Sequence, residues 1–142
     1  MTTLSLPHLG GTLLRLTAGI ALITHSLYLK VFVFTMSGTV AFFESIGLPG
    51  LLAWVTLLVE IVTGAMLTFK IKPHLAATAA VPVLLGAIWA HSSNGWLFSN
   101  AGGGWEYPLF WTMTLLSIAL TEWQSTKVVA SSDVETCALP KH

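Results

Sequence analysis

The chain has 142 residues, of which 54% are hydrophobic and only 8% are charged. Soluble domains carry roughly 25% charged residues, so the composition excludes an ordinary soluble fold and indicates a protein whose solvent is the lipid bilayer. The formal net charge is zero, so no global field recruits nucleic acid, and the single cysteine, Cys137, excludes an internal disulfide.

Four long apolar stretches follow one another along the chain, each near the ~20 residues that a helix needs to cross a bilayer. They cover about 11–34, 51–69, 74–91 and 107–123. No basic segment precedes the first stretch, which argues against a cleaved signal peptide. We therefore predict an all-α integral membrane four-helix bundle over residues 1–123, followed by a polar, mobile cytoplasmic tail over 124–142.

The segments between the apolar stretches predict the topology. Residues 35–50 contain no Lys or Arg, and their apolar run from Thr39 to Ile46, closed by Gly47 and Pro49, predicts a short interfacial helix. The loop at 92–106 also lacks basic residues.

Basic residues gather at the other connections. Lys70 and Lys72 occupy the second connection and Lys127 follows the fourth stretch. The positive-inside rule then places this turn and both termini in the cytoplasm, with the chain in the cell inner membrane. Trp96, Trp105 and Tyr107 fit an aromatic belt at the outer interface.

Ionisable side chains inside the apolar stretches are the candidate functional residues, since each costs a few kcal/mol to insert. They are Arg15, His25 and Lys30 in the first stretch, Glu60 in the second, His91 at the end of the third and Glu106 at the start of the fourth. Glu60 lies about 13–14 Å below the outer surface. We expect all of these except Arg15 to converge in the outer half of the bundle.

Helical spacing places several of these residues on shared faces. Glu60 shares a face with Thr56, Thr63 and Gly64. Small residues lead along the third stretch to His91 in the order Ala76, Ala80, Val83, Ala87, a pattern typical of helix contacts in membranes. Arg15, Gly19 and Ser26 share one side of the first helix, and His25 and Lys30 lie roughly 80° away.

Each candidate also has a structural interpretation. Lys30 can extend to the outer headgroups, and Arg15 can reach the inner surface or pair with Glu122. Glu60 is protonated, paired with His25 or Lys30, or functional. His91 fits an interfacial hydrogen-bonding residue better than a metal ligand.

The chain resembles the DoxX family of small four-helix membrane proteins over about residues 13–120. The matching residues, in chain order, are Leu14-Arg15-Leu16, Gly19, His25, Lys30, Gly47-Leu48-Pro49, Glu60, Gly64, His91, Asn94, Gly95, Phe98, Gly104, Glu106, Tyr107 and Pro108-Leu109. Ser26 stands where the family has glycine, and Lys30 is displaced from the usual basic position. The resemblance implies a membrane subunit linked to quinone-dependent oxidation.

Our first functional hypothesis is a quinone-linked subunit of a membrane redox complex. We assign Glu60 and His25 as catalytic, and Arg15, Lys30, His91 and Glu106 as cofactor-binding, because a quinone needs hydrogen-bond donors and a proton path. The sequence lacks a flavin or nicotinamide fingerprint and a CxxC motif, so the redox partner is expected to be another subunit.

Two other functions are compatible with the sequence. The chain fits a non-catalytic anchor or assembly subunit that docks a larger enzyme through the 92–106 loop, with its polar residues joining helices. Haem or metal binding through His25 and His91 is a weaker hypothesis, since two single histidines specify little. Transport would need oligomerisation.

Overall fold

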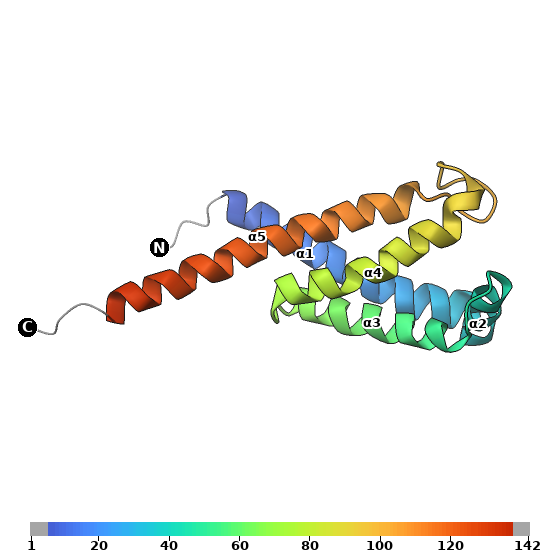
Figure 1. Cartoon of the computed structure of the whole chain (residues 1–142), viewed down its shortest axis with the longest axis horizontal. Coiled ribbons are helices and arrows are strands. Elements are labelled where there is room, and N and C mark those ends of the chain that lie inside the picture. The colour runs from blue at the N-terminus through green and yellow to red at the C-terminus, as the bar shows by residue number, and fades with distance from the viewer. Residues whose placement is uncertain (1–5, 138–142) are drawn as a thin grey trace, which may run out of the picture.

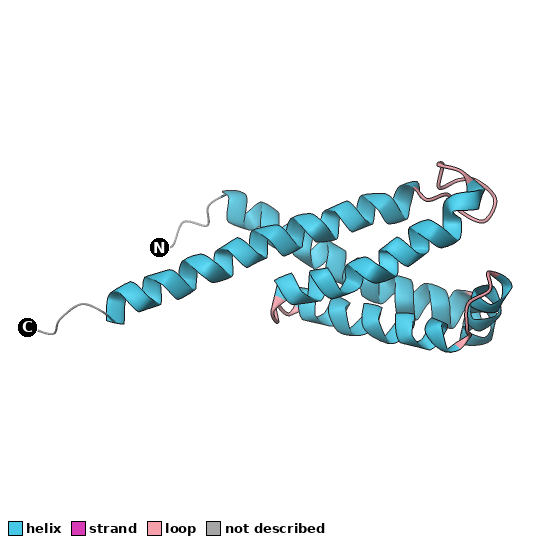
Figure 2. Cartoon of the chain, in the orientation of Figure 1, coloured by secondary structure: helices cyan, strands magenta, loops and turns pink. Residues whose placement is uncertain are grey.

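A computed structural model describes residues 6–137, with the backbone alone described for Pro7 and residues 125–137. The described chain is helical, with no strand (Figure 2). Its elements are α1 (Leu6–Thr24), the π-helix η1 (His25–Val33), α2 (Thr35–Ser45), α3 (Leu51–Thr68), α4 (Pro73–His91), the 3₁₀ turn η2 (Ser92–Asn94) and α5 (Glu106–Cys137). The predicted all-α membrane bundle is confirmed, and a helix lies between the first two long helices as expected.

Three helical segments within the described residues are long and apolar enough to cross a membrane: His8–Val33, Leu51–Thr68 and Pro73–Asn94. α5 is not among them, although it packs along α4 and against α1. Its inward face buries Trp111, Leu115 and Ile118. The fourth crossing therefore stays a prediction, supported by the place of α5 in the bundle.

α5 continues further than the sequence indicated. The apolar stretch ends near Trp123, but the helix runs on to Cys137, because the residues that follow include helix formers and no glycine or proline before that point. The boundary at residue 123 marks a change in polarity and not the end of the helix. Residues 138–142 of the predicted tail lie outside the described part of the chain.

The long helices run alternately up and down, so the bundle has two distinct ends (Figure 1). The turn between α3 and α4, the start of α1 and the far half of α5 lie toward one end. We call this the turn end. α2 and the connection from η2 to α5 lie at the other, the loop end. Many large apolar side chains on the outer faces are exposed, as expected for helices that contact lipid.

α1 and α3 approach closely where two glycines meet. A Cβ atom added to Gly19 would lie 2.8 Å from the backbone oxygen of Gly64 and 2.6 Å from Oγ1 of Thr68. A Cβ added to Gly64 would lie 2.8 Å from the oxygen of Gly19. Small residues permit such approach in membranes, and here they set the position of α1 against α3.

Gly19→Ala is expected to lower the free energy of unfolding by about 1–3 kcal/mol, because the added methyl group forces two backbones apart. Gly86→Ala is the matched control, since a Cβ at Gly86 meets nothing within 4 Å. Thermal unfolding in detergent measures both. Equal melting temperatures for the two variants would contradict the close crossing.

Candidate polar site

The centre of the site is an ion pair between η1 and α3. Lys30 Nζ donates to Oε2 of Glu60 at 2.6 Å, and Ser26 Oγ donates to the same oxygen at 2.5 Å. The three side chains are buried, with exposed fractions of 9%, 3% and 0% for Lys30, Glu60 and Ser26. Glu60 is therefore paired with Lys30 and not with His25. Lys30 does not extend to the lipid headgroups.

The π-helix explains how Lys30 reaches Glu60. In η1 each amide bonds five residues back, as Phe34 N does to the Leu29 oxygen at 2.8 Å, so each residue turns less than in an α-helix. The angle around the helix axis between Lys30 and Arg15, roughly 80° for α-helical spacing, is therefore smaller. Lys30 comes closer to the side of the helix that carries Arg15 and Ser26. The backbone oxygen of Lys30 also accepts a hydrogen bond from Thr39 Oγ1 at 3.1 Å, which holds α2 against this turn.

Glu60 and His25 keep free hydrogen-bonding capacity. Both bonds to Glu60 end on Oε2, and Oε1 has no partner among the described residues. Neither His25 ring nitrogen has one in that part of the chain. Oε1 of Glu60 and the His25 nitrogens are also not fully buried. In the described part of the chain, the side-chain atoms that are both fully buried and without a hydrogen-bond partner are Arg15 Nε and His74 Nδ1. A ligand or water can therefore bond to Glu60 and His25.

His25 lies beside the ion pair and contacts α5. Its ring packs edge-on to Trp111, with centroids 5.8 Å apart. Of the predicted grouping, Lys30 and Glu60 are in direct contact, whereas His25 contacts Trp111 and His91 is held by the loop between η2 and α5. Ser26, which the sequence analysis noted on one side of the first helix and as a departure from glycine, is the additional partner of Glu60.

His91 and Glu106 are bound to the loop between η2 and α5. His91 Nδ1 lies 3.0 and 3.2 Å from the oxygens of Gly102 and Gly103. Glu106 Oε2 accepts a hydrogen bond from the amide of Phe98 at 3.3 Å. The sequence analysis expected Glu106 to join Glu60, but the structure shows its carboxylate closing the loop instead.

Arg15 lies away from the site, at the turn end. Its Nη1 donates to the oxygens of Leu67 and Thr68, which are about 10 Å along α3 from Glu60. Those carbonyls lie at the end of α3, where the regular helical bonds stop, and that of Leu67 also accepts a bond from the Lys70 amide at 3.3 Å, so Arg15 helps to cap α3. The Arg15–Glu122 contact expected from the sequence is present as an ion pair at 3.8 Å, although Nε forms no hydrogen bond. Arg15 therefore lies apart from Lys30, His91 and Glu106, which the sequence analysis assigned with it as cofactor-binding.

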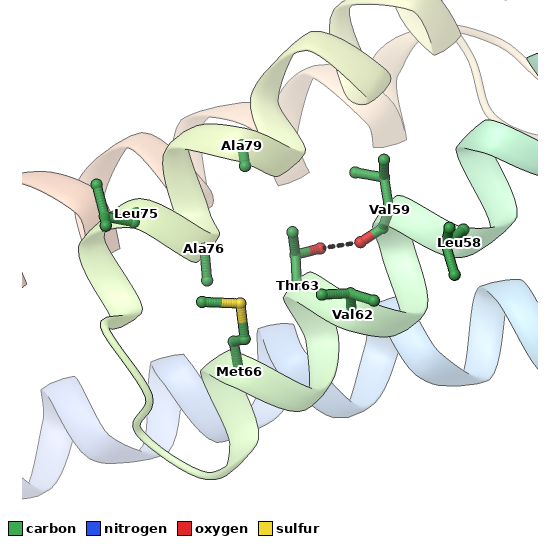
Figure 3. Close-up of a pocket in the computed structure, with 8 residues that line it drawn as sticks. All are labelled: Leu58, Val59, Val62, Thr63, Met66, Leu75, Ala76 and Ala79. Carbon is green, nitrogen blue, oxygen red and sulfur yellow. Dashed lines mark hydrogen bonds between the residues drawn. The ribbon is translucent and has the colours of Figure 1, made fainter.

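Two surface grooves border the bundle. The first, of about 380 Å³, lies between α3 and α4 and is lined by Leu58, Val59, Val62, Thr63, Met66, Leu75, Ala76 and Ala79 (Figure 3). Its one polar side chain, Thr63, donates to the backbone oxygen of Val59 at 2.7 Å, so this groove is apolar.

The second groove lies at the loop end. It measures about 390 Å³ and is lined by Trp96, Phe98, Glu106, Tyr107, Leu109, Phe110 and Met113. The Tyr107 ring lies 5.7 Å from Trp111, and Trp111 in turn contacts His25. A continuous row of rings thus joins this groove to the polar site. Within the described residues, no group of three or more His, Cys, Asp or Glu side chains is placed to hold a metal ion.

Comparison with known proteins supports one family. A family profile described as DoxX matches residues 10–93. The chain is 30% identical over 113 residues to a Bacillus subtilis (strain 168) protein named "Putative oxidoreductase CatD", covering 80% of this chain and 79% of that one. No solved structure matches the chain.

Breaking the Lys30–Glu60 pair from one side is expected to cost about 3–5 kcal/mol of unfolding free energy, because a charge remains buried alone. Lys30→Met and Glu60→Met each remove one partner, and the double variant removes both. We expect the double variant to lose less than the sum of the singles, by about 0.5–3 kcal/mol.

Unfolding in mixed micelles measures all three variants. Lys72→Met, in the exposed turn between α3 and α4, controls for the loss of a lysine and is expected to have little effect. Strictly additive losses at residues 30 and 60 would show that the two side chains do not interact.

Proposed function

Because the chain belongs to the DoxX family, we propose that it is the membrane subunit of a quinone-linked redox complex. The name of its Bacillus subtilis relative contains the word oxidoreductase, which supports a redox role. In the proposed function Glu60 and His25 contact the quinone, and Lys30 and Ser26 position Glu60.

The free hydrogen-bonding atoms of Glu60 and His25 carry this proposal. A quinone supplies an electron-accepting ring whose two carbonyl oxygens take up protons on reduction. A site for it needs polar atoms that can bond to those oxygens, held within apolar walls. Oε1 of Glu60 and the His25 ring nitrogens meet that need, since no other described residue bonds to them.

The location of Glu60 suits proton transfer. Lys30 and Ser26 fix Oε2 from one side, so Oε1 is held in one position. A general acid or base acts best when its geometry is fixed before the reaction. We propose that Oε1 of Glu60 exchanges a proton with the bound quinone.

In this proposal the quinone ring reaches Glu60 and His25 from the groove at the loop end. Aromatic side chains line it, and its row of rings ends at His25. The outward faces of the bundle provide apolar surface for an isoprenoid tail. We therefore propose that the quinone headgroup approaches from this groove. Trp111, which lies between Tyr107 and His25, must then move aside for the headgroup to contact His25 and Glu60.

Electrons must come from another protein in this proposal. The sequence has no flavin or nicotinamide fingerprint and no CxxC pair. The loop at 92–105 presents exposed apolar side chains, including Trp96, Leu97 and Phe98. We propose that a partner subunit docks there, and that this face lies outside the inner membrane, with the Lys70 and Lys72 turn and both termini in the cytoplasm.

The test is quinone occupancy in the purified native assembly. Glu60→Gln keeps an acceptor for Lys30 and Ser26 but cannot take up a proton. It is expected to lower quinone affinity at least about tenfold, since a charged hydrogen bond contributes ≈ 1.5–3 kcal/mol, and to stop quinone-dependent turnover. Glu44→Gln, on the exposed face of α2, is the matched control. Unchanged occupancy and turnover in Glu60→Gln would refute the assigned role.

A second candidate function is a non-catalytic membrane anchor. The observation in its favour is that Lys30 and Ser26 join η1 to α3 through Glu60, as interhelical bonds do in purely structural bundles. An anchor would co-purify with a larger complex whose cofactors lie in other subunits. Its Glu60→Gln variant would lose assembly or stability while the assembled fraction kept full turnover.

A further inference from the structure

The surface groove between α3 and α4 ends next to the turn that joins the two helices. Its lining residues are the eight drawn in Figure 3. On α3 they extend from Leu58 to Met66, about 12 Å along the helix axis. On α4 they extend from Leu75, beside the turn, to Ala79. The groove thus follows both helices from the middle of the bundle to the turn end.

The lining of this groove suits a hydrocarbon chain. Ala76 and Ala79 end at one methyl group each, which leaves space between α4 and the larger side chains of α3. The hydroxyl of Thr63, the one polar side chain, bonds within its own helix to the Val59 oxygen at 2.7 Å. Because the groove offers no free polar group, a polar ligand gains nothing by entering it.

The turn beside the groove carries two exposed lysines, Lys70 and Lys72. The exposed apolar side chains of Phe69 and Ile71 alternate with them, as expected for a segment at the boundary between hydrocarbon and headgroups. The ion pairs found within the described residues involve other side chains, so neither lysine of the turn has an acidic partner there. The turn therefore presents two uncompensated positive charges.

Backbone hydrogen bonds hold the turn against the end of the groove. The Ile71 amide donates to the Met66 oxygen at 2.8 Å, and the amides of Leu75 and Ala76 donate to the Lys72 oxygen at 3.0 and 3.2 Å. Met66, Leu75 and Ala76 all line the groove. An anionic group bound at the lysines would therefore lie next to a hydrocarbon chain in the groove.

Both lysines have a backbone conformation that glycine adopts more easily. Their φ angles are +57° for Lys70 and +42° for Lys72, in the left-handed region where the Cβ atom of an L residue is crowded. Glycine at either position would remove that strain, so the turn itself does not require lysine. Backbone strain of this kind accompanies ligand sites, and here it indicates a role for the two ammonium groups.

We propose that the groove and the turn together bind one anionic phospholipid. One acyl chain lies along α3 and α4, and the headgroup phosphate accepts hydrogen bonds from the ammonium groups of Lys70 and Lys72. Basic pockets between membrane helices are a general basis for recognising anionic headgroups. The lysines therefore select phosphatidylglycerol over zwitterionic phosphatidylcholine. This site lies at the opposite end of the bundle from the loop-end groove and needs no quinone.

Retention of lipid by the full chain tests the charge requirement. The protein is reconstituted in vesicles of equal parts phosphatidylglycerol and phosphatidylcholine, released into mild detergent and weighed with its bound lipid by native mass spectrometry. We expect one phosphatidylglycerol per chain, retained at least about tenfold more often than phosphatidylcholine, because two lysines near a headgroup attract an anionic lipid.

The lysine variants separate this site from a general attraction to the bilayer. Lys70→Gly and Lys72→Gly, combined in one chain, are expected to abolish the preference while the turn still folds, because glycine fits both φ angles. Lys127→Gln is the matched control. It removes a positive charge from α5, outside the groove and the turn, and is expected to keep the preference. Thermal unfolding in detergent confirms that each variant is folded.

A variant of the groove tests the acyl-chain requirement. Ala79→Phe places a ring in the groove and is expected to lower retention of phosphatidylglycerol at least about tenfold, because the displaced lipid also leaves the two lysines. Thr78→Phe is the matched control. It adds the same ring at an exposed position of α4 that does not line the groove, and it is expected to retain the lipid like the wild type.

Photocrosslinking of the wild type locates the lipid without any variant. Phosphatidylglycerol with a diazirine in one acyl chain is mixed at trace level into phosphatidylcholine vesicles that contain the protein. After illumination, mass spectrometry of peptides is expected to find the label concentrated in residues 58–66 and 75–79. A phosphatidylcholine probe with the same acyl chain is expected to show no such concentration.

Equal retention of the two phospholipids, or an equal loss of preference in Lys127→Gln, would overturn the proposal in favour of diffuse attraction. Wild-type retention in Ala79→Phe would show that the groove is not used. A lipid-free dimer, or a quinone retained in place of the phospholipid, would give the groove to another occupant. Identical labelling by the two photoprobes would mean surrounding bilayer lipid only. None of these results involves Glu60, so this proposal and the proposed function fail separately.

Discussion

Lys30 and Glu60 are charged groups that hydrocarbon tolerates poorly when they are apart, and their 2.6 Å contact joins the first long helix to the second. Most of the local structure follows from making that contact. The π-helix turns Lys30 toward α3, Ser26 adds a second donor to the same oxygen, and Thr39 ties the interposed helix to the Lys30 carbonyl. A buried pair of this kind adds little net stability compared with apolar residues, but it allows one arrangement of the helices and few others.

The pair also divides the bundle into two unlike ends. Toward the turn end, Gly19 and Gly64 bring two backbones together and Arg15 closes α3 by capping its last carbonyls. Toward the loop end, His91 is bound to an ordered loop, and Oε1 of Glu60 has no partner among the described residues. One end of the bundle is tightly packed, and the other keeps polar groups that are free to bond.

The sequence predicted the long helices well, because apolar length acts over many residues and averages out local detail. It left Glu60 as protonated, paired with His25 or Lys30, or functional, and the structure has the pairing with Lys30. It did not predict the π-helix, because α-helical spacing was assumed and nothing in the nine residues His25–Val33 marks a wider turn. Glu106 was misplaced for a different reason: its partner is the Phe98 amide of the loop, a contact that depends on loop geometry.

The contact between Lys30 and Glu60 can be measured directly. Solid-state NMR of the protein in lipid bilayers, labelled with nitrogen-15 at lysine side chains and carbon-13 at glutamate carboxyl groups, reports the dipolar coupling between Lys30 Nζ and the Glu60 carboxyl carbon. The account predicts a strong coupling, as for two groups in hydrogen-bond contact, that disappears in Glu60→Gln samples lacking the labelled carboxyl group. An absent coupling in the wild type, with Lys30 instead in contact with lipid headgroups, would contradict it.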